Sequence, residues 1–342
     1  MALAELKANT HLCYAVKDAH KHCYHKWQRI DILMKYRTFK SGILNHCYQR
    51  SADHGLIFYS QNDYLVWFTT VCTVAPRHKI KILGLCPMPD HIHMAVIAQT
   101  KQDLSRFMGE VNRTFSKLQN DVCHLKWSWF ERPFGSVPKE GSKVGRNCLL
   151  YVGNNPPERQ LAEKAEDYRW TFLAYAVSTH PFSEKLVIRN ATWPMRQAIK
   201  EVRAQHKAGK PLKYNLLQRL FQRLNNGEVE QLIDFIVSSY DVIDHKEALR
   251  FFDGSYKKMT EALSLSTAKE YDLNESFVGK SDKPYATMAR MILEKYKLDD
   301  IHQMLSWPQE QKAQAFRFLR TTTRYVPEQI SKFLHWWGQK KP

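Results

Sequence analysis

Two histidines, His91 and His93, stand two residues apart in a segment whose pattern predicts a β-hairpin over residues 83–97. Side chains two residues apart on a strand project from the same face, so we expect the two imidazoles to lie together. Histidine is a common metal ligand, and the pair could hold one ion. Ile92 and Met94 would then face a core on the other side. A lone pair of this kind is weak evidence for a metal site, so the neighbouring residues matter.

A candidate nucleophile, Tyr151, lies on a short helix expected over residues 144–152. Its hydroxyl is a poor nucleophile at the usual tyrosine pKa of about 10. A divalent metal changes this by polarising a phosphate and stabilising the leaving oxygen, so that a phosphotyrosine intermediate can form. Asn155 follows one helical turn later and could supply a third ligand. Because Pro156 comes next, we expect Asn155 just past the helix end.

The elements that would position these residues alternate between strands and helices up to about residue 178. Pro87 and Pro89 suit a tight turn ahead of His91. Strands are expected at residues 43–50, 79–86, 91–98 and 127–134, and helices at residues 61–72, 103–118 and 144–152.

The helix that begins at Asp103 is amphipathic, and its apolar stripe is expected to belong to the core. Its other face carries basic side chains that could follow a nucleic-acid backbone. The candidate nucleic-acid contacts are Arg106, Arg113 and Lys117 on this helix and Arg132 in the aromatic segment before residue 134.

Beyond about residue 180 the alternation typical of strands disappears and helical patterns dominate. The basic stretch that contains Gly209 and Pro211 resembles a linker. Helices at residues 285–320 could form a DNA-binding helix-turn-helix or a bundle packed on the first domain. We therefore expect an N-terminal extension at 1–40, a catalytic domain at 41–178, a basic linker at 179–215 and a helical domain at 216–342.

The charge of the chain points to a polyanionic partner. Its 342 residues include 51 Lys and Arg against 34 Asp and Glu, a formal net charge of +17. Such an excess is typical of proteins that bind nucleic acid. No export signal or membrane-spanning run is evident, and the seven cysteines form no CxxC pair. These features favour a cytoplasmic, nucleoid-associated protein with reduced thiols. A His- and Cys-rich stretch at residues 11–25 fits a basic helix face better than a zinc site.

Four stretches in order along the chain carry a resemblance to a known family. Residues 86–94 (CPMPDHIHM) resemble the "MPNHVHLL" stretch of REP-associated tyrosine transposases, which are single-tyrosine HUH nucleases. Residues 130–137 (FERPFGSV) resemble their "F..RFKS" strand. Residues 151–156 (YVGNNP) and 166–170 (EDYRW) resemble "YI..NP" and "PEDYRWSS". The resemblance covers about residues 41–178.

The resemblance implies an α+β fold, in which an antiparallel sheet flanked by helices (ferredoxin-like or RRM-like) precedes an all-α C-terminal domain. It also implies that His91, His93 and Asn155 bind Mg²⁺ or Mn²⁺ and that Tyr151 is the nucleophile. The implied substrate is single-stranded or hairpin DNA, cut to a 5′-phosphotyrosine and a free 3′-hydroxyl that can be rejoined elsewhere. The active form would be a monomer or a homodimer, with the tyrosine acting in cis or in trans.

The sequence also departs from the family pattern. Asp90 replaces the usual asparagine, Gly135 replaces a basic residue, and Pro157-Glu158 interrupts "NPVRAG". Three alternatives remain open: a non-catalytic nucleic-acid-binding protein with the HUH fold, a replication or conjugation nickase, and a phosphodiesterase that uses water.

Overall fold

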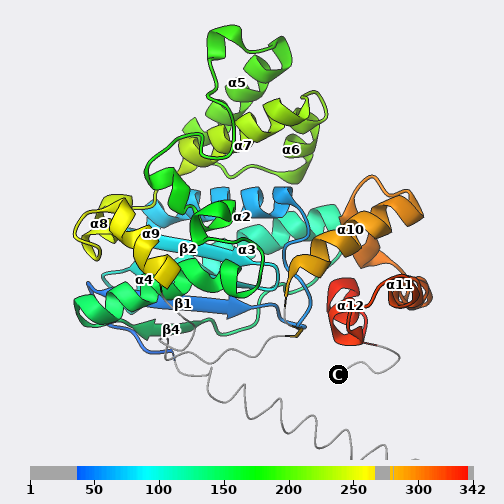
Figure 1. Cartoon of the computed structure of the whole chain (residues 1–342), viewed down its shortest axis with the longest axis horizontal. Helices are drawn as coiled ribbons and strands as arrows, with labels where there is room; N and C mark the ends of the chain where they lie inside the picture. Colours follow the sequence, from blue (N-terminus) through cyan, green and yellow to red (C-terminus); the bar gives the residue numbers. More distant parts are fainter. Residues whose placement is uncertain (1–36, 266–277, 280, 338–342) are drawn as a thin grey trace, which may run out of the picture.

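A computed structural model describes residues 37–265, 278–279 and 281–337. Its centre is one four-stranded antiparallel sheet in the order β2-β3-β1-β4 (Figure 1). The strands are β1 (Leu44–Arg50), β2 (Lys81–Met88), β3 (His91–Ile97) and β4 (Gly135–Pro138). The expected α+β fold is therefore confirmed, whereas most of the expected N-terminal extension and the stretch 11–25 lie outside the described residues.

The two faces of the sheet pack against different helices. Ile92, Met94 and Val96 of β3 join a core with α2 (Gln61–Val74) and α3 (Lys101–Cys123). The opposite face packs against α4 (Gly141–Glu158), α8 (His245–Arg250) and α9 (Tyr256–Leu265). The alternation of β3 thus gives the histidines and the core residues opposite faces, as the sequence predicts.

Three elements differ from expectation. Residues 127–134 form no regular strand, although a bridge between Ser51 and Phe130 and the Glu131 amide, which donates to the Arg50 carbonyl, join them to the end of β1. Asn120 on α3 holds this segment instead, through the carbonyl of Trp127 and the indole of Trp129. Pro87 lies within β2, where an edge strand tolerates a residue that cannot donate. Helix α4 extends through Pro156, so Asn155 lies inside the helix and not beyond its end.

The segment 179–215 is folded and is not a linker. It contains α5 (Trp193–Lys207), whose apolar side Met195, Ala198, Ile199 and Val202 is buried. This helix packs against α7 (Asn226–Tyr240), and α6 (Tyr214–Phe221) lies between them in the sequence. The remaining boundaries of the expected domains stay a prediction.

The C-terminal helices lie beside one end of the sheet (Figure 1). They are α10 (Lys283–Tyr296), a 3₁₀ helix at Ile301–Ser306, α11 (Gln309–Thr322) and α12 (Pro327–Leu334). Lys312 lies on α11, the last of the helices that could form a helix-turn-helix, and it is buried with its ammonium group 5.6 Å from the centre of the Trp127 ring. In the described residues, no helix is both long and apolar enough for a membrane span.

Candidate active site

The register of the sheet gathers several polar side chains on the face covered by α4. His93 is paired with Tyr48 of β1 and His91 is paired with Arg50. Because paired residues on adjacent strands share a face, all four side chains belong to the same side of the sheet. His46 belongs to it as well, since it stands two residues before Tyr48.

Helix α4 brings Tyr151 onto this face. Its ring centre lies 5.2 Å from that of His93 and 5.5 Å from that of His46, each time edge to face. The rings of His91 and His93 are 4.8 Å apart. Tyr151 is 5% exposed and His93 is fully buried, so the group is shielded from bulk water.

Asn155 completes the group on the next turn of α4. Its amide nitrogen donates to the carbonyl of Tyr151 at 2.8 Å, and its side chain also hydrogen bonds with the ring of His93. The structure therefore brings together the four residues that the sequence singled out for the reaction.

His93 occupies surroundings that suit a neutral imidazole. Burial, together with His91 and Arg50, lowers the pKa of His93 well below its usual value. A neutral imidazole keeps a lone pair, which a metal ion requires. The Nδ1 atom of His93 lies 3.1 Å from Nε2 of His46.

His91 has a charged neighbour at its own Nδ1 atom. A carboxylate oxygen of Asp90 lies 2.6 Å away, and the other oxygen forms an ion pair with Lys332 of α12. Burial alone would raise the pKa of Asp90, but Lys332 and His91 hold it well below its usual range. Asp90 is therefore a carboxylate that can accept a hydrogen bond from His91 Nδ1, and that tautomer would leave the lone pair of His91 on Nε2.

The donor set is compatible with the implied metal. Two imidazoles with one amide oxygen form a mixed set, suited to Mn²⁺ and, through the oxygen, to Mg²⁺. Across the described ranges 37–265, 278–279 and 281–337, no group of three or more His, Cys, Asp or Glu is placed to hold a metal ion. The third ligand expected on this face, Asn155, is of a residue type outside that set.

The candidate DNA contacts do not gather at this site. Arg106, Arg113 and Lys117 are exposed on α3, which covers the opposite face of the sheet. Arg132 is also exposed, but its backbone is close to the site because the amide of Glu131 donates to the carbonyl of Arg50 at 2.9 Å.

The sequence reasoning missed several residues of the site. His46, Tyr48 and Arg50 alternate along β1, and this period of two was a usable signal. The structure also explains why position 135 is a glycine, because a Cβ atom there would lie 2.1 Å from the Tyr48 ring. Lys332 had no local signal, since it is 242 residues away from Asp90 in the sequence.

Comparison with known proteins gives a family match over the segment that contains His91 and His93. Residues 58–133 match the family model described as "Transposase IS200 like". A solved structure of a REP-associated tyrosine transposase bound to a REP hairpin is similar at 17% identity, with a TM-score of 0.35 over 40% of this chain and 80% of that one. No curated protein matches the sequence. The resemblance to the tyrosine transposases is thus confirmed by the IS200-like match over residues 58–133.

Proposed function

We propose that this protein is a metal-dependent endonuclease and strand transferase that acts on single-stranded or hairpin DNA. The observation that carries the proposal is the position of Tyr151, whose ring lies 5.2 Å from that of His93. Asn155 follows on the same helix and hydrogen bonds with that histidine. The candidate nucleophile and the three candidate metal ligands thus share one shielded face, which supports the proposal.

Tyr151 supplies the nucleophilic oxygen in the proposed reaction. This oxygen loses its proton and bonds to phosphorus, the bond from phosphorus to the 3′-oxygen breaks, and the 3′-oxygen takes up a proton and leaves as a hydroxyl. The products are a 5′-phosphotyrosine and a free 3′-end, which can attack the same linkage to rejoin DNA. His91, His93 and Asn155 would hold Mg²⁺ or Mn²⁺, which polarises the phosphate and stabilises the leaving oxygen.

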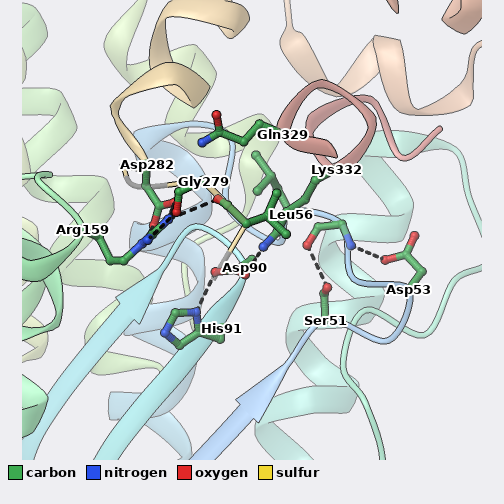
Figure 2. Close-up of polar contacts among 12 residues, drawn as sticks. Ser51, Asp53, Leu56, Asp90, His91, Arg159, Gly279, Asp282, Gln329 and Lys332 are labelled. Atoms are coloured by element: carbon green, nitrogen blue, oxygen red, sulfur yellow. Dashed lines mark hydrogen bonds and ion pairs between the residues drawn. The ribbon is translucent and has the colours of Figure 1, made fainter. Parts of the chain in front are cut away.

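The rigidity of the surroundings supports this assignment. Helix α4 is fixed at its C-terminal end by Arg159, which forms a two-armed ion pair with Asp282 at 2.7 and 3.1 Å (Figure 2). Nearer the tyrosine, the Asn154 amide donates to the carbonyl of Leu263 at 3.0 Å. A nucleophile held in place loses little entropy when it reaches the attacking position.

The test is cleavage of hairpin oligonucleotides labelled at either end, with Mn²⁺ or Mg²⁺, read on a denaturing protein gel. A 3′-labelled strand should label the protein, and a 5′-labelled strand should not. Tyr151→Phe should abolish the adduct because only the nucleophilic oxygen is lost. Tyr296→Phe is the matched control, since it removes the same hydroxyl group from α10, away from this face.

Each other result favours a different function. Cleavage without an adduct would favour a phosphodiesterase that uses water, and binding without cleavage would favour a non-catalytic nucleic-acid-binding protein. Replacing both His91 and His93 with alanine should remove cleavage in either metal. A double variant that still cuts in EDTA would exclude the metal site.

We propose that Arg106, Arg113 and Lys117 bind DNA outside the cleavage site. They are exposed on the face of α3 that points away from the sheet. Each phosphate contact to a single strand contributes about 0.7 to the slope of log affinity against log salt. Replacing all three with alanine should reduce that slope by about 2. An unchanged slope would place the DNA elsewhere.

A further inference from the structure

Lys332 of the C-terminal helix α12 reaches the residue that contacts a candidate metal ligand. Figure 2 shows Asp90 between His91 and Lys332, although α12 belongs to a distant part of the chain. The side chains of Asp90 and Lys332 are each 10% exposed. Burying both charges costs desolvation free energy, which only a well-aligned ion pair offsets.

The backbone around Asp90 is fixed independently of Lys332. The carbonyl of Asp90 accepts from the amide of Ser51 at 3.0 Å. The carbonyl of Pro89 accepts from the amides of Ile57 and Phe58 at 2.7 and 3.0 Å. The remaining freedom of Asp90 is therefore rotation of its carboxylate, and Lys332 binds the oxygen that does not contact His91.

Helix α12 is also held in place by contacts other than the ion pair. The Tyr59 hydroxyl donates to the carbonyl of Phe333 at 2.7 Å. The ring of His335 lies 2.8 Å from the carbonyl of Leu56 and 2.6 Å from a carboxylate oxygen of Asp53. Lys332 thus contacts Asp90 from a helix that other hydrogen bonds also hold in place.

We propose that Lys332 is a positioning residue, which fixes the Asp90 carboxylate so that it orients His91 for metal binding. This inference rests on the proposed function, because His91 is taken there as a metal ligand. In this role Lys332 acts through Asp90, the residue with which it forms its ion pair. The chain thereby uses its C-terminal helix to complete a site that its N-terminal half begins.

The test measures Mn²⁺ binding by calorimetry on the full chain without DNA. Lys332→Met should weaken binding by about 10- to 100-fold, the usual effect of losing a group that orients a ligand. Asp90→Asn combined with Lys332→Met should recover most of the affinity, because a neutral amide oxygen can still accept from His91 Nδ1. Lys283→Met is the matched control, since Lys283 is exposed at the start of α10.

A second measurement needs no metal. Long-range ¹H–¹⁵N correlation spectra of the metal-free protein should show His91 protonated at Nδ1, a signal identified by its loss in His91→Ala. Lys332→Met should replace this signal with a mixture of tautomers, and the double variant should restore it. Lys332→Gln provides the same comparison if the methionine variant does not fold.

The outcomes separate the two proposals. If the wild-type chain binds Mn²⁺ and Lys332→Met binds it equally well, the positioning role is overturned and the metal site stands. A double variant no better than the single one would also overturn it. If the wild-type chain binds no Mn²⁺, the proposed metal site fails, and the tautomer spectra alone decide whether Lys332 orients His91.

Discussion

His302 is a buried cation that joins the C-terminal region to the sheet domain. Its Nε2 atom lies 2.8 Å from the carboxylate of Asp63 at the start of α2, and its Nδ1 atom lies 2.5 Å from that of Asp300. Burial would lower the pKa of His302, but Asp63 and Asp300 raise it from 6.5 to about 10. We expect His302→Gln to remove a large, pH-dependent part of the stability.

The sign and the size of the stability contribution of His302 follow from proton linkage. Since the pKa of His302 is higher in the folded chain, its contribution is complete below pH 6.5 and is lost as the pH rises through about 10. A pKa difference of one between the folded and unfolded chains corresponds to about 1.4 kcal/mol, so the full contribution is about 5 kcal/mol.

The assay is urea unfolding, followed by tryptophan fluorescence, at pH values from about 6 to 9. The free-energy difference between wild type and His302→Gln should shrink by about 1.4 kcal/mol for each pH unit above 6.5. His124→Gln, at an exposed histidine, controls for the loss of an imidazole. A difference that stays constant over this range would refute the view that His302 is charged in the folded chain.

Three further substitutions test other parts of the structure by the same unfolding measurement. Arg159→Met should cost about 3–5 kcal/mol, because it leaves Asp282 as an uncompensated charge with both side chains only 5% exposed. A cost of about 1 kcal/mol or less, as for a surface ion pair, would contradict this. Gly135→Ala should cost about 1–3 kcal/mol through its clash with Tyr48, and Tyr48→Ser in the same chain should recover it. Lys312→Met should stabilise the chain by about 3 kcal/mol below pH 8, because burial lowers the pKa of Lys312 from 10.5 to about 8. This gain should vanish as the pH approaches 10.5, and a gain that does not depend on pH would argue against a buried ammonium group.

Local periodicity predicted the parts of the site that depend on one element. The two-residue repeat of β3 placed His91 and His93 on one face, and the four-residue spacing placed Tyr151 and Asn155 on successive turns. These patterns are properties of a strand and a helix, so they can be read without knowing the fold.

The parts that were wrong or missed depend on tertiary contacts. Residues 127–134 have the composition of a strand, but Asn120 of α3 binds the backbone of Trp127 and the segment forms no regular strand. Asn155 stays helical because the turn that contains the prolines still forms, with the amide of Arg159 donating to the Asn155 carbonyl at 3.1 Å. The pairing of Lys332 with Asp90 joins distant segments, and no local pattern indicates it.

The two anchors of α4 restrict how copies of this chain can exchange segments. The helix is bonded to Leu263 through Asn154 and to Asp282 through Arg159. A dimer that swapped α4 alone would break a buried ion pair in each copy. A swap that preserves these bonds must carry Leu263 and Asp282 across together with α4. Tyr151 and both anchors of its helix would then come from the same chain, whichever copy supplies the histidines.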